Sequence, residues 1–266
     1  GQGVILLLIQ VGGMGVVTMA VAIFMFSGRK IGLKQRWVMQ ESISAPQVGG
    51  IVRMTGFILK TAFLIEAIGA LLLALRFCPQ FGLGKGIWYG IFHAVSAFCN
   101  AGFDLMGETG AFSSLTGYVG DPLVNLVICL LIVVGGLGFL TWHDVAAHGR
   151  HVSQYRLQSK LILLTTLALL VGGFLFFRFY EFSRPQWAAL TGGERGLAAL
   201  FQSVSPRTAG FNTVDLTQLS ACSQLMTILL MLAGGSPGST AGGFKTTTLA
   251  VLLLSVGAVI RRQGSA

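Results

Sequence analysis

The sequence predicts an all-α integral membrane protein, and three observations support that prediction. Hydrophobic residues make up 53% of the 266-residue chain and charged residues only 10%, with a mean hydropathy of +0.76. Soluble domains carry about 25% charged residues, so this chain lacks the polar surface that a water-soluble protein needs. The apolar residues are also gathered in long blocks, as spanning helices require. Finally, these blocks recur in a repeated order.

The apolar blocks differ in length, and length decides what each one can do. Blocks of about 20 residues can cross the hydrocarbon core, whereas shorter blocks indicate re-entrant or interfacial helices. One block stops at a stretch rich in glycine and proline and then resumes, which predicts a broken helix. We expect spans at 3–26, 54–76, 122–142 and 161–179, short helices at 88–98 and 195–206, and a broken span made of 217–233 and 247–260.

Basic residues give the chain a net charge of +9, and most of them lie between the apolar blocks. This distribution follows the positive-inside rule and indicates a multi-pass protein of the cell membrane. Nucleic-acid binding is not expected, because it requires a continuous basic surface. The residues concerned are Arg29, Lys30, Lys34, Arg36, Arg53, Arg150, Arg156, Lys160, Arg261 and Arg262.

An internal repeat organises the chain. Residues 92–96 (Phe-His-Ala-Val-Ser) match residues 201–205 (Phe-Gln-Ser-Val-Ser), which begin 109 positions later, and each copy leads into Ala-Gly-Phe at 101–103 and 209–211. Double glycines at 12–13, 135–136 and 234–235 mark the spans that end each unit. The repeated unit is therefore a span, a short helix, a loop centred on glycine and a second span.

This unit divides the chain into three parts. We expect the last span of a first repeat with a cytoplasmic loop at 1–50, a second repeat at 51–158 and a third repeat at 159–266. The third repeat ends in the broken span. Two repeats supply two loops, so we expect the chain not to close a ring of such loops by itself.

The glycine-centred loops have the properties of a cation filter. A dehydrated cation needs oxygen ligands, and backbone carbonyls supply them when several loops face one axis. Glycine allows the backbone angles that align successive carbonyls and leaves the axis open. A tight turn is the structural alternative, but two matching copies make it the weaker interpretation. The predicted cation ligands, which would bind K⁺ if the resemblance described below holds, are the carbonyls of Cys99, Asn100, Ala101, Gly102, Arg207, Thr208, Ala209 and Gly210.

The broken span is predicted to act as a gate or hinge. Its residues are Gly234, Gly235, Ser236, Pro237, Gly238, Gly242, Gly243 and Lys245. We hypothesise that the Lys245 ammonium opposes cations in the closed pore; the alternative is a lysine that reaches the interface or pairs with an acid. Residues 238–246 nearly match a phosphate-binding loop, but Phe244 interrupts the required Gly-Lys-Thr, so nucleotide binding here is not expected.

Other charged residues carry separate expectations. Glu66 is expected to form a structural ion pair with another span, and the Arg207 side chain to point away from the axis toward an acid or a carbonyl. Asp104, Glu108 and Asp121 are expected on the outer side, where they would raise the local cation concentration.

The chain resembles the Trk/Ktr/HKT superfamily of potassium transporters, and most of all the membrane subunit of bacterial Ktr systems. Residues 92–103, 205–213 and 234–246 carry the resemblance. It implies four span–pore helix–span repeats around one pseudo-fourfold pore, with Gly102 and Gly210 as central filter glycines of repeats two and three. Relative to that pattern, the chain shows neither the first part of repeat one nor repeat four, and Cys99 stands where asparagine is more familiar.

The same resemblance implies the function and the partners. It implies potassium uptake gated by the intramembrane loop, in a homodimer of pore subunits that rests on a cytoplasmic nucleotide-binding ring of RCK type, in a bacterial inner membrane. No cofactor is expected in this chain. The alternatives are a sodium-coupled or less selective cation transporter, a secondary transporter with broken helices and a non-conducting scaffold subunit. An enzyme is not expected, because no His, Asp, Glu or Ser groups converge at one depth.

Overall fold

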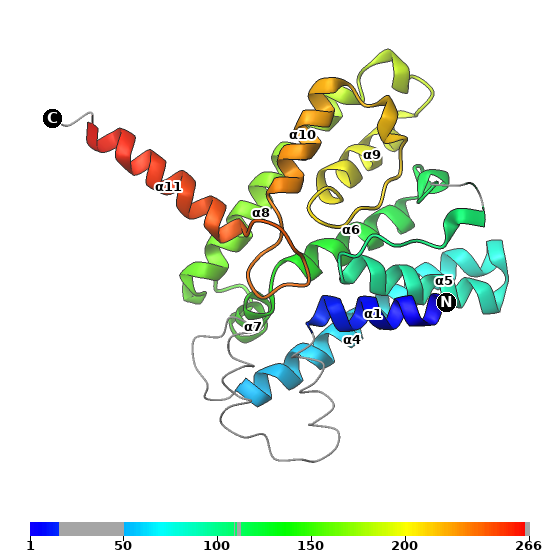
Figure 1. The fold of residues 1–266 in the computed structure, drawn as a ribbon, viewed down its shortest axis with the longest axis horizontal. Coiled ribbons are helices and arrows are strands. Elements are labelled where there is room, and N and C mark those ends of the chain that lie inside the picture. Colours follow the sequence, from blue (N-terminus) through cyan, green and yellow to red (C-terminus); the bar gives the residue numbers. More distant parts are fainter. Residues whose placement is uncertain (16–50, 109, 111–112, 264–266) are drawn as a thin grey trace.

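The computed structural model describes residues 1–15, 51–108, 110 and 113–263, and within them the regular secondary structure is helical apart from one isolated β-bridge (Figure 1). Residues 16–26 of the expected first span lie outside this part. The helices are α1 (Gln2–Met14), α4 (Ile51–Phe81), α5 (Leu83–Phe98), α6 (Pro122–Gly136), α7 (Phe139–His148), α8 (Leu157–Phe176) with the π-helical turn η4 (Phe177–Glu181), α9 (Gly192–Val204), α10 (Ala221–Leu232) and α11 (Thr246–Gln263). Short 3₁₀ turns are η1 (Met106–Glu108), η2 (Thr116–Tyr118), η3 (Val152–Gln154), η5 (Pro185–Trp187) and η6 (Leu216–Gln218).

Two described helices are long and apolar enough to cross a membrane, α4 and α8 with its π-turn. Helix α4 has 31 residues and runs past the expected span at both ends, continuing through Pro79. At 1.5 Å per residue it is about 46 Å long, which exceeds the hydrocarbon core of about 30 Å. Leu64, Leu71, Leu164 and Leu167 are exposed on these helices, as lipid-facing side chains would be.

The span expected at 122–142 is bent in the structure, which the sequence analysis did not predict. Helix α6 ends at Gly136 and α7 leaves it at an angle of 99°. Gly138 takes a φ of 89°, a conformation that favours glycine, and the N–H of Phe139 donates to the Gly238 carbonyl at 2.7 Å. The backbone group freed by the bend is thus satisfied by the glycine-rich loop, which is why a break is tolerated at this depth.

The short helices α5 and α9 enter from the ends of the long ones and stop inside the molecule. They have 16 and 13 residues, or about 24 and 20 Å, so neither can cross the membrane. Helix α5 packs along α4, and α9 along α8. The inner end of α5, residues 92–98, is fully buried. Two re-entrant helices therefore point their carbonyl ends into the core.

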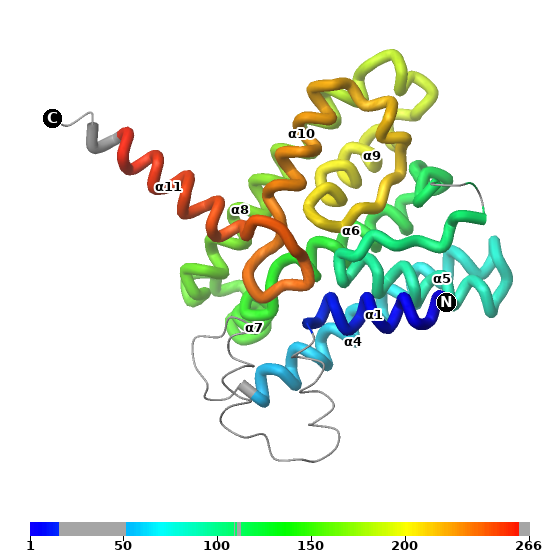
Figure 2. Tube along the Cα trace, viewed as in Figure 1, coloured from blue at the N-terminus to red at the C-terminus, as the bar shows by residue number. Residues whose placement is uncertain are grey.

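The third unit ends in a broken span, as predicted. Helix α10 stops at Leu232, α11 begins at Thr246, and a compact loop connects them (Figure 2). Ala233 and Phe244 form an isolated parallel bridge that closes the neck of this loop. Figure 1 shows α11 extending away from the other helices toward the C-terminus. The elements α8, α9, α10 and α11 thus follow the order of α4, α5, α6 and α7.

Candidate functional site

The two glycine-centred loops have the same backbone conformation. Asn100 and Thr208 have φ values of 52° and 71°, and the glycines two positions later, Gly102 and Gly210, have φ values of 73° and 92°. Positive φ is uncommon for residues other than glycine. Two copies of the same rare pattern indicate that the loops are structurally equivalent, as the sequence repeat predicts. We call residues 99–102 the first filter segment and residues 207–210 the second.

The two filter segments lie side by side. A Cβ atom added to Gly102 would stand 2.2 Å from the Ala209 carbonyl oxygen and 3.2 Å from the Gly210 Cα atom. One added to Gly210 would lie 3.7 Å from the Gly102 Cα atom. Only glycine fits at position 102, because any side chain there would collide with a predicted ligand of the other segment.

A serine at the end of each short helix fixes the segment that follows. Ser96 Oγ donates to the Phe103 carbonyl at 2.7 Å, and Ser205 Oγ donates to the Phe211 carbonyl. The serine carbonyls accept in turn from Ala101 N–H at 2.8 Å and Ala209 N–H at 3.0 Å. Each serine therefore closes its loop from both sides. The sequence analysis did not predict this role. Both serines belong to the matched repeat, and that match is the signal that could have identified them.

The predicted ligand carbonyls are free. Throughout the described part of the chain, no N–H, O–H or side-chain donor bonds to the carbonyls of residues 99–102 or 207–210. The neighbouring carbonyls are occupied, since Phe98 accepts from Thr240 Oγ1 and Pro206 from Thr208 N–H. Of these eight residues, Cys99, Arg207 and Ala209 are buried and Gly210 is exposed. Free carbonyls in two adjacent loops are available to a ligand that takes the place of a hydrogen-bond donor.

The glycine-rich loop between α10 and α11 is closed by its own hydrogen bonds. Gly234 N–H donates to the Phe244 carbonyl at 3.0 Å and Gly235 N–H to the Gly242 carbonyl at 3.0 Å. Lys245 Nζ donates to the Ala241 carbonyl at 2.9 Å, and the side chain is half-buried. We call residues 233–245 the gate loop. Its lysine is held by a carbonyl of the same loop, and no acid in the described ranges pairs with it.

The gate loop packs against the bend between α6 and α7. Its N–H groups at Ser236 and Thr240 donate to the Gly136 and Gly135 carbonyls at 3.0 and 3.2 Å. These acceptors are among the last carbonyls of α6, which a helix leaves without internal partners. The double glycine was expected to allow close approach between helices. Gly135 does so, since a Cβ there would lie 2.0 Å from the Phe98 carbonyl oxygen.

The gate loop also contacts both filter segments. Thr240 Oγ1 donates to the Phe98 carbonyl at 2.8 Å and accepts from Asn100 Nδ2 at 3.0 Å. A Cβ added to Gly243 would lie 3.4 Å from Thr208 Cγ2 of the second segment. Thr240 is the principal contact that sequence reasoning missed, because nothing in the sequence relates it to residues 140 positions away.

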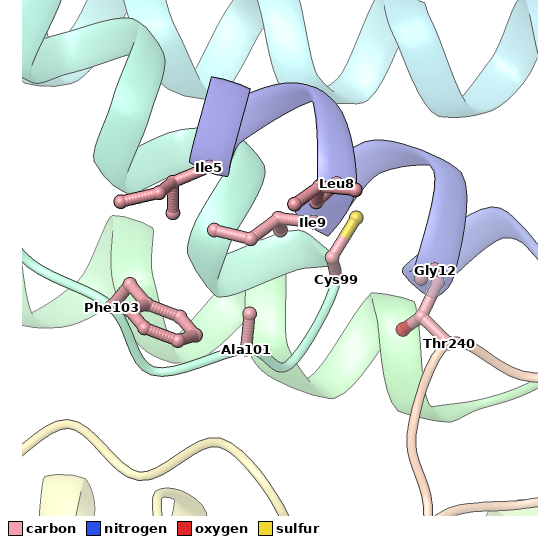
Figure 3. Close-up of a pocket in the computed structure, with 9 residues that line it drawn as sticks. Ile5, Leu8, Ile9, Gly12, Cys99, Ala101, Phe103 and Thr240 are labelled. Atoms are coloured by element: carbon pink, nitrogen blue, oxygen red, sulfur yellow. The ribbon is translucent and has the colours of Figure 1, made fainter. Parts of the chain in front are cut away.

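A cavity of about 460 Å³ opens beside the first filter segment (Figure 3). Helix α1 provides one wall and the filter loop another, with the gate-loop Thr240 at one end. The residues around it are Ile5, Leu8, Ile9, Gly12, Gly13, Cys99, Ala101, Phe103 and Thr240. Gly13 allows close packing, because a Cβ there would lie 2.5 Å from the Cys99 side chain. Gly12 does not have this role, because a Cβ there would meet nothing within 4 Å.

Two expectations about buried charges are not met among the described residues. Glu66 forms no ion pair with any described residue; its carboxylate accepts instead from Gln10 Nε2 and Cys99 Sγ. Arg207 reaches neither an acid nor a carbonyl in the described part of the chain, and its Nε is buried without a partner. It lines a small cavity between α6, α8, α9 and the gate loop.

The outer acids are mostly neutralised. Asp121 pairs with Arg76, and Glu108 with Lys85 at 2.6 Å, while the Asp104 carboxylate caps the Met106 N–H at 2.9 Å. The Lys85 hydrogen bond lowers the pKa of the Glu108 carboxyl. Two of the three acids are therefore offset by a cation, which weakens the predicted enrichment of cations at this surface.

Comparison with known proteins links this geometry to transport. A family model named TrkH and described as a cation transport protein matches residues 2–265. The chain is 41% identical over 261 residues to the potassium/sodium uptake protein NtpJ of Enterococcus hirae, and 42% identical over 262 residues to the Ktr system potassium uptake protein B of Bacillus subtilis. These alignments cover 98% of this chain but 56% and 58% of those relatives.

A solved structure shares the fold. The crystal structure of the potassium transporter TrkH from Vibrio parahaemolyticus superposes with a TM-score of 0.67 at 22% identity. The match covers 96% of this chain and 48% of that one. The chain thus spans about half the length of the proteins it matches, and it does so with the helical arrangement of a membrane transporter.

Proposed function

Because the chain belongs to the TrkH family of cation transport proteins, we propose that it conducts K⁺ across a cell membrane through a filter that includes its two filter segments. The free carbonyls of residues 99–102 and 207–210 carry this proposal. They lie in adjacent loops at the carbonyl ends of α5 and α9, where the helix dipole favours a cation. The glycine in each loop leaves room for an ion.

In this proposal the two segments are two parts of one pseudo-fourfold ring. The gate loop lies against both segments and obstructs the ion path until it moves. The Lys245 ammonium would add a positive charge to the closed state and repel cations there. The loop is a suitable moving part, because its contacts are hydrogen bonds and glycine backbones with few large side chains.

The assembly and the transported ion complete the proposal. We propose a homodimer of pore subunits on a cytoplasmic nucleotide-binding ring in a bacterial inner membrane, with no cofactor in this chain. The Bacillus subtilis relative carries the name of a potassium uptake protein. The name of the Enterococcus hirae relative includes sodium as well as potassium. That name favours a sodium-coupled or less selective cation transporter as the second candidate function.

Substitution of the filter glycines tests the proposal. Gly102→Ser forces a non-glycine residue to a φ of 73° and places its Cβ against the Ala209 oxygen. Strain and collision together should displace the Ala209 carbonyl, so we expect the K⁺/Na⁺ permeability ratio to fall by about tenfold, which is about 1.4 kcal/mol of lost discrimination. Gly210→Ser has strained φ but no collision, so its effect should be smaller. The measurement is ion flux by the full-length protein in liposomes.

Gly84→Ser is the matched control, because it lies at the outer start of α5 in open space and without positive φ. It should leave the permeability ratio unchanged. Normal ratios in both Gly102→Ser and Gly210→Ser would exclude these segments as the filter and favour the scaffold alternative.

A further inference from the structure

Cys99 of the first filter segment is held between helices on two sides. On the α1 side, a Cβ added to Gly13 would lie 2.5 Å from both the Cβ and the Sγ atoms of Cys99, so the helix backbone packs directly on the thiol. On the α4 side, Cys99 Sγ donates to Glu66 Oε1 at 3.8 Å. Glu66 therefore contacts a residue whose carbonyl is a predicted ion ligand, although Glu66 itself is not a predicted ligand.

The Glu66 carboxylate also joins the two helices to each other. Gln10 Nε2 of α1 donates to both of its oxygens, at 3.0 and 3.1 Å. Glu66 is only 4% exposed, and no described lysine, arginine or histidine pairs with it. A carboxylate buried in this way is costly and is retained in membranes mainly where it serves a function. Its three hydrogen bonds all lead to α1 or to the filter.

The position in the second filter segment that corresponds to Cys99 has no buried carboxylate beside it among the described residues. Arg207 precedes its filter glycine by three positions, as Cys99 does, and it lines a cavity of about 10 Å³ together with Gly136 and Thr166. Thr166, on the first span of that unit, and Arg207 Nε both lack a hydrogen-bond partner. The support behind the two segments is thus chemically different, and within the described ranges only the first segment is hydrogen-bonded to a neighbouring span, through Cys99 and Glu66.

We propose that Glu66 is a positioning residue for ion selectivity, a role that rests on the proposed function. Its carboxylate fixes Cys99 against Gly13, and Cys99 begins the segment whose carbonyls face the ion. Selectivity depends on the number and placement of such carbonyls, so a shift at the start of the segment changes it. The Gln10 contact makes the placement depend on α1 as well as on α4.

Glu66→Gln tests this role with little change in shape. One of its two acceptor oxygens becomes an NH₂ group, and because Gln10 Nε2 bonds to both oxygens, this NH₂ group faces the Gln10 donor and forces the pair that holds Cys99 to rearrange. We expect the K⁺/Na⁺ permeability ratio of the full-length protein to fall about threefold to tenfold, the size of effect expected when one or two weak hydrogen bonds are lost. Cys99→Ala removes the thiol from the other side and should lower the ratio similarly. The double variant should lose less than the sum of the two single losses, because both changes disturb the same Cys99–Glu66 bond.

Glu181→Gln is the matched control. Glu181 is also a fully buried carboxylate, but its donors are Trp187, Gln186, Ser220 and Ser223 at the outer end of α8, away from the filter segments. Its loss should reduce protein yield and leave the permeability ratio of the remaining transporters unchanged. If Gly102→Ser alters selectivity while Glu66→Gln and Cys99→Ala do not, the role of Glu66 is excluded and the filter stands. Additive effects in the double variant would also overturn it.

Discussion

Gly135 illustrates how single residues decide the geometry around the filter. It lies on α6 where the first filter helix and the gate loop meet, and its missing side chain leaves space for both. A Cβ at this position would lie 2.0 Å from the Phe98 carbonyl oxygen and 2.8 Å from Thr240 Oγ1. Backbone atoms cannot move aside as a flexible side chain can. The collision would therefore displace α6, the end of α5 or the gate loop.

We therefore expect Gly135→Ala to destabilise the protein. Overpacking a well-packed site costs about 1–3 kcal/mol, which should lower the melting temperature of the purified protein in detergent by several degrees. Gly136→Ala is the matched control, since a Cβ there meets only Ala241 Cβ at 4.0 Å. Equal melting temperatures for the two variants would show that α6 does not pack against Phe98 as described.

At the scale of elements, the short filter helices depend on their ends. Helix α9 begins with a capping box: Thr191 Oγ1 accepts from Glu194 N–H at 3.4 Å and Glu194 Oε2 accepts from Thr191 N–H at 2.7 Å. A helix of 13 residues is marginal by itself, so its caps and its packing against α8 hold it. Helix α6 uses a different device, with Asp121 as N-cap and Pro122 in the first turn.

Thr191→Ala should weaken the second filter helix. Loss of an N-cap threonine costs about 0.5–2 kcal/mol, measured as a lower melting temperature at pH 7. The Thr191 backbone bond lowers the pKa of the Glu194 carboxyl. A lowered pKa means that the stabilisation by Glu194 is present above the ordinary glutamate pKa of about 4.3 and is lost as the pH falls through the lowered value.

Glu194→Gln separates the two parts of the cap, because its side-chain oxygen can still accept from Thr191 while its charge is gone. The acid-dependent loss of stability should therefore be smaller in Glu194→Gln than in the unmodified protein. An identical pH dependence in both proteins would mean that other carboxyls determine the acid transition.

At the scale of the whole molecule, the gate loop is the element that joins the units. It bonds to the first filter segment through Thr240, approaches the second at Gly243 and Thr208, and satisfies the backbone at the α6–α7 bend. Movement of this loop would change contacts in all three places at once. Gating and filter geometry are therefore expected to be coupled, because they share hydrogen bonds.

Thr240→Val should loosen the gate. It keeps the shape of the side chain but removes the bonds to Phe98 and Asn100, each worth about 1 kcal/mol. We expect K⁺ flux through the non-activated full-length protein to rise by about tenfold, measured by uptake into liposomes. Thr227→Val on α10 is the matched control, since it also loses two hydrogen bonds, to Gln202 and Ser223, outside the gate loop. Flux that is equal in the two variants would argue against a closing role for Thr240.

The main features of the fold and of the candidate site follow from sequence patterns, because they depend on local chemistry. Apolar length separates spans such as α4 and α8 from the short helices α5 and α9. The repeated Ala-Gly-Phe identifies both filter segments, and glycine with Pro237 predicts the broken span. These signals are readable because each acts within a few residues of the position it determines.

Tertiary structure alone decided the contacts between distant segments. The bend after Gly136 depends on a loop about 100 residues later, which accepts the freed Phe139 N–H. Among the described residues, Glu66 bonds to Gln10 and Cys99 and to no cation, and Arg207 pairs with no acid. Hydrophobic periodicity and charge reveal which residues are buried or costly, but the partner of a buried polar group is set by packing across the chain, which no local pattern records.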